Sequence, residues 1–378
     1  MDFKLSEEEK LIRDTAAQFV RREMLTRERD YLRQEELFLA PGDPPRRELD
    51  PEVYDSLRTI ARRIGLWALE LPSSSDGDSM SAVARVLVHR EFGRTIVPFK
   101  PASIPALLAG TPYARELRDG KLSLSLAFDQ LHKAGTLDGI TTCYRQVADG
   151  FSLSDSCVDI SDDPEADLFL LPARHGGSER VRLFLIASDA PGVRIDAGED
   201  LTTDAVMASL SLNQCILSKD QLLGHEFDIA TIVASEQLRI AARCLGISMR
   251  CLADTIEHAR NRVTFGRPLA QRQAVQWMLA DLSTEISTST WLTLEAAWRA
   301  DSDMPYFQEA AQAKKRAAKT AFQAADTAIQ IHGGYGVCKE FPFEGFYREA
   351  RLLRLIFGRE TEIDRGRGKR FIEEVAMR

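Results

Sequence analysis

The stretch that decides the fold is QIHGGYGVCKEFPFEGFYREARLLRLIFGRETEIDR, residues 330–365. It follows residues 308–331, QEAAQAKKRAAKTAFQAADTAIQI, which are rich in Ala, Gln and Lys and contain no Gly or Pro. This composition predicts a long helix that ends near Ile331. Gly333 and Gly334 come next, and paired glycines at such a point either cap the helix or let a ligand approach the backbone. Beyond them, FPFEGFYREARLLRLI predicts another helix, followed by a turn at RETEIDR and a last helix.

Two further blocks accompany this stretch. They are RVTFGRPLAQRQAVQWMLADLST, residues 262–284, and DFKLSEEEKLIRDTAAQFVRRE, residues 2–23. In this order along the chain, the three blocks resemble the first helix, the RxxFG segment with its Gln-containing helix, and the C-terminal signature of the acyl-CoA dehydrogenase superfamily of flavoproteins. The resemblance implies a mainly α fold with an N-terminal helical domain, a middle β-barrel and a C-terminal four-helix bundle.

Hydrophobic periodicity divides the chain into the same three zones. Apolar residues recur at helical spacing before about residue 118, short β-type runs such as ADLFLLPAR and VRLFLIAS follow, and helical texture returns from about residue 223. We therefore expect a helical domain over 1–118, a β domain over 119–222 and a helical bundle over 223–378. The prolines of LAPGDPPRRELDP, residues 39–51, indicate a loop.

Composition and charge restrict the partners. The chain has 57 acidic and 49 basic residues, a net charge of −8, and no Lys/Arg run of the kind that marks a nucleic-acid surface. Neither a bilayer-spanning apolar run of about 18 residues nor a secretory leader is visible, so we expect a cytoplasmic protein without a membrane span. The six cysteines show no metal-ligand or disulfide spacing, so neither a metal nor a disulfide scaffold is expected.

The resemblance implies FAD-dependent α,β-desaturation of an acyl thioester, an oxidation at a CH–CH bond. A carboxylate removes the α-proton while the β-hydrogen leaves as hydride to the flavin. Many family members carry this base in the segment that corresponds to IFGRETEI, but here the position is Gly358. Other branches carry it on the long helix before RxxFG, and that register falls on Glu236. The alternative interpretation of Glu236 is a surface residue paired with Arg239.

The cofactor contacts implied by the resemblance fall on both blocks. In the family, the RxxFG residues reach across a subunit interface to the FAD diphosphate, and QxxGGxG lies beside the ADP part. Arginine suits such a diphosphate because its planar fork donates charge-assisted hydrogen bonds. Carried over residue by residue, the implied FAD contacts are Arg262, Thr264, Phe265, Gln273, Gln330, Gly333, Gly334 and Glu362. Glu360 replaces a usual Thr and brings a negative charge near them.

The β zone departs from the family. The loop that usually holds the flavin ring is replaced by a segment containing Asp129, Gln130, Leu131, His132 and Lys133, which we interpret as an exposed loop. Contacts sent to a neighbouring subunit's FAD are thus kept, and those to the chain's own flavin are largely lost. This pattern predicts a homo-oligomer or a heteromer with a homologous, motif-complete subunit.

Three interpretations follow from this pattern. They are an acyl-CoA dehydrogenase with Glu236 as base, a different flavin-dependent oxidation or monooxygenation, and a non-catalytic subunit that completes a partner's FAD site. The first implies an acyl-CoA or acyl-carrier-protein thioester as substrate and an electron-transfer flavoprotein as electron acceptor.

Overall fold

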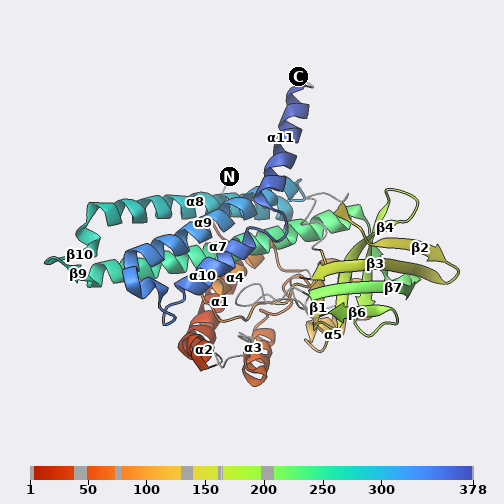
Figure 1. Cartoon of the computed structure of the whole chain (residues 1–378), viewed down its shortest axis with the longest axis horizontal. Helices are drawn as coiled ribbons and strands as arrows, with labels where there is room; N and C mark the ends of the chain where they lie inside the picture. Colours follow the sequence, from red (N-terminus) through yellow and green to blue (C-terminus); the bar gives the residue numbers. More distant parts are fainter. Residues whose placement is uncertain are drawn as a thin grey trace. The chain divides into compact units, whose positions relative to one another are not determined.

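The computed structural model describes residues 4–37, 49–72, 79–128, 139–160, 163, 165–196 and 208–376 of the chain. They form a mainly α architecture with a β-sheet in the middle of the sequence, as predicted (Figure 1). The chain divides into two compact units. Unit 1 comprises Met1–Leu66, Ser81–Pro101 and Gln237–Arg354, and unit 2 comprises Trp67–Met80, Ala102–Glu236 and Leu355–Arg378. The long helix α7 (Glu226–Asn261) begins in unit 2 and ends in unit 1. The three-domain division with limits at 118 and 222 stays a prediction.

The N-terminal helices of unit 1 begin at residues that satisfy free backbone N–H groups. Before α1 (Glu7–Phe19), Ser6 and Glu9 form a reciprocal capping box. A π-helical turn (Val20–Met24) joins α1 to α2 (Leu25–Leu37). At α3 (Pro51–Arg63), the Asp50 side chain accepts from the N–H groups of Glu52 and Val53, and Ser81 caps α4 (Ala82–Phe92) in the same way. Most of the predicted loop over 39–51 lies outside the described residues.

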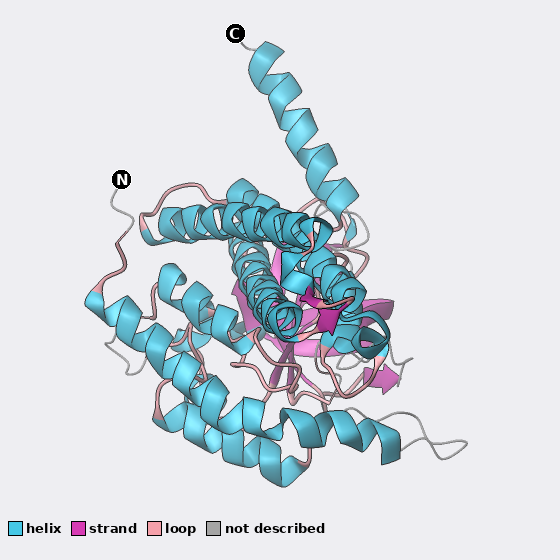
Figure 2. Ribbon diagram, turned by 90° about the vertical axis from the view of Figure 1, so that its left-hand side faces the viewer, coloured by secondary structure: helices cyan, strands magenta, loops and turns pink. Residues whose placement is uncertain are grey.

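The C-terminal part of unit 1 contains α8 (Gln273–Asp301), α9 (Phe307–His332) and α10 (Phe343–Leu353). Figure 2 draws the helices in cyan and the strands in magenta. Helix α9 packs against both α8 and α10. Its buried face consists largely of alanines, whose small side chains let neighbouring helices approach closely. The predicted long helix over 308–331 is thus confirmed to within a residue at each end.

A buried polar cluster connects three segments of unit 1. The Glu28 carboxylate on α2 accepts hydrogen bonds from the Thr95 hydroxyl at 2.9 Å and the Ile96 N–H at 3.1 Å. It also pairs with the Arg250 guanidinium of α7 at 2.9 Å. Because Glu28 is 7% exposed, each of these donors offsets the cost of taking its charge out of water. The cluster fixes α2 against α7.

Unit 2 is built on a sheet whose eight described strands follow the order β6-β7-β3-β2-β4-β5-β8, with β1 paired to β4. Its two longest strands, β3 (Gly150–Ile160) and β7 (Ala208–Ser218), run antiparallel. Phe169, Phe184 and Leu210 are among the buried side chains of the sheet's core. The other strands are β1 (Leu124–Leu126), β2 (Cys143–Val147), β4 (Leu168–His175), β5 (Val181–Ala187), β6 (Val193–Asp196) and β8 (Leu222–Gly224).

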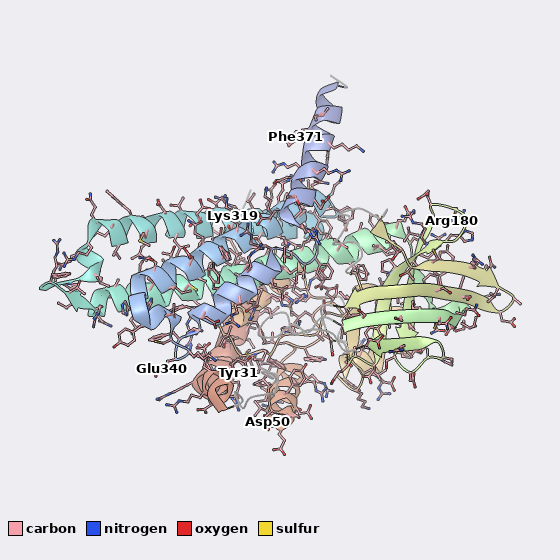
Figure 3. The ribbon with its side chains drawn as sticks, in the orientation of Figure 1. Tyr31, Asp50, Arg180, Lys319, Glu340 and Phe371 are labelled. Atoms are coloured by element: carbon pink, nitrogen blue, oxygen red, sulfur yellow. The ribbon has the colours of Figure 1, made fainter. Side chains whose placement is uncertain are left out.

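The smaller elements of unit 2 are the 3-10 turns η2 (Ala106–Gly110) and η4 (Lys219–Gln221), the short helix α5 (Ala114–Arg118) and the C-terminal helix α11 (Glu360–Ala376). The expectation of a turn at RETEIDR is wrong, because α11 begins at Glu360 within that stretch. Glu360 and Glu362 occupy its first turn, where carboxylates interact favourably with the helix dipole. Every side chain of α11 from residue 364 to 372 is exposed, and Phe371 is labelled in Figure 3.

Candidate cofactor and catalytic residues

The RVTFG segment forms a tight hairpin at the end of α7. Strands β9 (Val263–Thr264) and β10 (Arg267–Pro268) are joined by Phe265 and Gly266, both with positive φ, at 49° and 77°. Two consecutive positive-φ residues make the turn type that matches the twist of a two-residue hairpin. Phe265 is 99% exposed at the tip. A large aromatic side chain that is almost fully exposed in a disfavoured backbone conformation is suited to contact something outside this chain.

The hairpin is held by an arginine that follows it. Arg272 donates a hydrogen bond to the carbonyl oxygen of Thr264 and lies 5.9 Å from the centre of the Phe265 ring. Arg262 is exposed at the end of α7, and its backbone N–H donates to the His258 carbonyl at 2.8 Å. Gln273 is exposed at the first position of α8. The four residues taken from this block are therefore gathered on and beside one hairpin.

The QIHGGYG segment lies at the C-terminal end of α9. Gly333 caps the helix with φ 63°, which confirms the capping interpretation. A Cβ added at Gly333 or Gly334 would meet nothing within 4 Å, whereas one at Gly336 would lie 2.5 Å from the Ile329 carbonyl oxygen. Gly336 is thus required by packing. The open backbone of Gly333 and Gly334, next to exposed Gln330, leaves room for a nucleotide diphosphate.

Two histidines connect these segments. The rings of His258 on α7 and His332 on α9 stack with centroids 4.1 Å apart. His258 lies one helical turn before Arg262, and His332 directly precedes Gly333. The sequence interpretation missed both. The one available signal was that each histidine belongs to a motif block, which does not indicate that their rings meet.

Glu236 lies on α7, in the part of that helix that belongs to unit 2. It is 2% exposed, and the Ser103 hydroxyl donates a hydrogen bond to its Oε1. Helix α7 is continuous from Glu226 to Asn261, so no insertion interrupts the register that selected Glu236. Its burial goes against the alternative of a surface residue. One residue earlier, the Ser235 hydroxyl donates to Glu70 at 2.7 Å, a second Ser–Glu pair of the same unit.

Gly358, which occupies the position where many family members carry the base, has an unusual backbone conformation. Gly358 has φ 110° and the preceding Phe357 has φ 48°. A side chain at Gly358 would be strained at this φ, so the local conformation is one that glycine permits and glutamate does not. Glu362 lies in the first turn of α11, where its carboxylate pairs with Arg365 at 3.9 Å. The loop containing residues 129–133 lies outside the described residues, as do Ser161, Asp162 and Pro164.

Residues 228–372 match the family model described as acyl-CoA dehydrogenase, C-terminal domain. The chain is 26% identical over 390 residues to (R)-benzylsuccinyl-CoA dehydrogenase of Thauera aromatica, covering 97% of this chain and 95% of the relative. It is 24% identical to the caffeyl-CoA reductase-Etf complex subunit CarC of Acetobacterium woodii, over 93% of this chain and 95% of that one.

A solved structure shows the same fold. The ChsE4-ChsE5 complex from Mycobacterium tuberculosis matches with a TM-score of 0.80 at 24% identity, covering 99% of both chains. Residues 228–372 therefore carry the C-terminal domain of the acyl-CoA dehydrogenase family, and relatives that match nearly the whole chain are named as acyl-CoA dehydrogenases and reductases. The predicted fold class and family are therefore confirmed. Within the described residues, no helix is long and apolar enough to cross a membrane, and no group of three or more His, Cys, Asp or Glu side chains could hold a metal ion.

Proposed function

We propose that this chain is an FAD-dependent acyl-CoA dehydrogenase that desaturates an acyl thioester between Cα and Cβ, with Glu236 as the base. The observation that carries the proposal is the state of Glu236, a carboxylate that is 2% exposed, accepts a hydrogen bond from Ser103, and lies on an unbroken helix in the expected register. Glutamate side chains are seldom this deeply buried, so a buried carboxylate in the expected helical register is a candidate for the base.

In the proposed reaction, the Glu236 carboxylate takes the α-proton of the thioester. The Ser103 hydroxyl holds Oε1 through its hydrogen bond and so limits the rotation of the carboxylate. When bound, FAD would accept the hydride that leaves Cβ, so that one proton and one hydride, two electrons in all, leave the substrate in each turnover. The products are then an α,β-unsaturated thioester and a reduced cofactor.

The residues Arg262, Gly333 and Gly334 have the chemical properties needed to hold the diphosphate of FAD. Arg262 is an exposed cation beside an exposed hairpin, and Gly333 and Gly334 offer backbone without a neighbouring atom within 4 Å of an added Cβ. These are the features that a diphosphate requires, namely a directed cationic donor and close backbone approach. Thr264, Phe265, Gln273, Gln330 and Glu362 are proposed as further contacts.

The test of this function is Glu236→Gln, which removes the base and retains the shape of the side chain. General-base catalysis contributes about 10²- to 10⁴-fold, so dehydrogenation should fall by that factor while flavin binding is retained. Glu70→Gln is the matched control, because Glu70 also accepts a hydrogen bond from a serine of unit 2. An unchanged rate in Glu236→Gln would refute Glu236 as base and favour a different flavin-dependent oxidation.

A second candidate function is supported by the exposure of the hairpin. Phe265 at 99% and Trp277 at 60% exposure lie on and just beyond it, as expected for a surface that contacts another subunit. We propose that the chain assembles with itself or with a homologous subunit whose FAD site it completes. A solved structure of this fold is described as a complex of two differently named chains, which supports a heteromer. A full complement of flavin on the chain expressed alone would contradict the heteromer and favour assembly of the chain with itself.

The remaining partners are proposals of the same kind. Relatives of this chain are named as enzymes of CoA thioesters, and one is named as a subunit of an Etf complex. We therefore propose an acyl-CoA thioester as the substrate, with a carrier-protein thioester as the alternative. An electron-transfer flavoprotein is the proposed electron acceptor. The cytoplasmic location stays a prediction.

A further inference from the structure

We propose that His258 and His332 form a positioning pair that fixes the Arg262 hairpin against the Gly333–Gly334 turn, and that the stacked imidazoles thereby set cofactor affinity. This inference rests on the proposed function, because it takes these two segments to be the cofactor contacts. It assigns a role to two residues that do not themselves touch the cofactor.

The rings of His258 and His332 are in close contact, and further aromatic rings pack against His332. Their centroids lie 4.1 Å apart with an interplanar angle of 30°. The His332 ring also contacts Phe343 at 4.5 Å and Phe341 at 5.7 Å, so aromatic rings surround it on more than one side. Aromatic pairs at such distances stabilise a structure beyond the area that they bury. The stack therefore acts as a specific link between the end of α7 and the end of α9.

A hydrogen bond fixes the orientation of His332. Its Nδ1 lies 2.7 Å from the carbonyl oxygen of Ala328, one turn earlier on α9. A carbonyl oxygen only accepts, so Nδ1 carries the proton and donates it. The ring is then held both by its own helix and by His258. Because Gly333 follows directly, the direction in which the chain leaves α9 is coupled to the position of this ring.

The contact between the two rings also affects the position of Arg262. Arg262 lies four residues after His258, and its backbone N–H donates to the His258 carbonyl oxygen. Residues four apart on a helix lie on the same face. A shift of His258 away from His332 would therefore move the hairpin that begins at Arg262. The distance between the arginine and the open glycine turn depends on the stack.

The stack lies beside an open groove of about 670 Å³, entirely within unit 1. The connection between η6 (Gly333–Val337) and α10 forms one wall, where Glu340 is labelled in Figure 3. The charged groups that line this groove from α2 are Glu28, Arg29 and Arg33. Those from α7 are Arg250, Asp254 and Glu257, and those from the η6–α10 connection are Lys339 and Glu340. These four cations and four carboxylates sum to no net charge. The groove therefore has no excess of negative charge that would stabilise a proton added to either histidine.

The stack requires neutral rings, and its surroundings favour them. Burial lowers the pKa of His258 below its usual value, and the charges of His332 and Arg262 lower it further. Burial also lowers the pKa of His332, although its bond to Ala328 acts in the opposite direction. A lowered histidine pKa means that the stacked state is fully favoured above pH about 6.5 and is progressively lost as the pH falls below that value. Cofactor affinity should weaken in the same window.

The experiment compares His258→Ala, which removes the ring, with His258→Phe, which retains the stack but cannot be protonated. FAD affinity is measured by titration of the apoprotein between pH 5.5 and 8, at about 0.3 M salt so that attraction between a protonated imidazole and the anionic ligand is largely screened. At pH 7.5 we expect His258→Ala to bind FAD about 3- to 10-fold more weakly than the wild type. His258→Phe should restore affinity and make its decline in acid shallower, because only the His332 ring of the pair can still be protonated.

His175→Ala is the matched control. His175 contacts Tyr144 edge-on at 5.2 Å and belongs to unit 2, whereas the Arg262 hairpin and the Gly333–Gly334 turn belong to unit 1, so its removal should change neither the affinity nor the pH profile. Equal affinity of His258→Ala and wild type would overturn the inference. So would an acid decline in His258→Phe that is as steep as in the wild type.

Hydrogen exchange separates this inference from the proposed function. In the absence of flavin, peptides covering residues 255–262 and 328–337 should lose protection together in His258→Ala and retain it in His258→Phe. Loss confined to the first peptide would contradict the coupling, whatever the flavin result. Failure of the wild type to bind FAD at any pH would instead count against the proposed function, and the exchange measurement would still decide the role of the stack.

Discussion

Gly93 at the end of α4 and Gly246 in α7 lie in direct backbone contact. A Cβ added to Gly246 would be 2.6 Å from the Gly93 Cα and 2.1 Å from the Arg90 carbonyl oxygen. Helix α7 also carries Glu236, and a close crossing of this kind leaves little freedom for it to slide or rotate. Gly246 lies ten residues after Glu236 on the same unbroken helix, so the crossing holds that helix at the glycine.

Gly246→Ala should therefore destabilise the protein despite alanine's higher helix propensity. The gain of up to about 1 kcal/mol from replacing a helical glycine is outweighed by the backbone clash, for which overpacking costs about 1–3 kcal/mol. Thermal unfolding should show a lowered midpoint. Gly110→Ala serves as the control, since a Cβ there meets nothing within 4 Å and should leave the midpoint nearly unchanged. Equal midpoints for the two variants would show that the crossing can relax.

Arg243 and Glu349 form a second tie between helices of unit 1. The guanidinium makes two hydrogen bonds to the carboxylate, at 2.7 and 2.9 Å, and a third to the Phe92 carbonyl oxygen at 2.6 Å. Glu349→Gln leaves a largely buried cation without its counter-charge, which should cost about 3 kcal/mol of unfolding free energy. Asp196→Asn is the comparison, because its pair with Arg194 is exposed and should contribute less than about 1 kcal/mol. Denaturant unfolding measures both.

The buried and the exposed cysteines should differ in their reactivity toward a thiol reagent. Burial raises the pKa of the Cys215, Cys244 and Cys251 thiols above their usual value. These thiols stay protonated at neutral pH and should resist a thiol reagent until the protein unfolds. Cys143 and Cys338 are exposed and should be modified in the native state. Peptide mapping after brief labelling at pH 7.5 checks this, and rapid modification of Cys244 or Cys251 would indicate local opening of α7.

Arg262 should contribute to flavin retention. Arg262→Met removes the proposed charge-assisted hydrogen bonds to the diphosphate, so the affinity for FAD should fall about 10-fold or more. Arg260→Met is the matched control, because Arg260 is also exposed near the end of α7 and lies outside the motif. Titration of the apoproteins with FAD gives both affinities. An equal loss in both variants would indicate a general electrostatic effect and no specific contact.

Local sequence pattern predicted much of the fold. The alanine-rich stretch over 308–331 carries its own helical preference, and ADLFLLPAR and VRLFLIAS form the strands β4 and β5. The local pattern was not sufficient where contacts with distant parts of the chain determine the secondary structure. RETEIDR contains enough polar residues to suggest a turn, yet it starts α11, and CYRQV forms β2 through pairing with β3 and β4 despite a mostly exposed set of side chains.

For the candidate site, motif and register selected residues individually and could not show how they are held. Ser103 is far from Glu236 in sequence, and only folding brings its hydroxyl to the carboxylate. The His258–His332 stack escaped notice for the same reason. Phe265 was selected by motif, but its positive φ and full exposure are properties of a turn that the residue type does not predict.

The central claim is that Glu236 removes the α-proton of an acyl thioester. The most direct test mixes flavin-loaded protein with an acyl-CoA under anaerobic conditions and follows the loss of flavin absorbance. We predict bleaching by the wild type and by Glu70→Gln, and at least about 100-fold slower bleaching by Glu236→Gln at the same flavin content. Bleaching of Glu236→Gln at the wild-type rate would contradict the account.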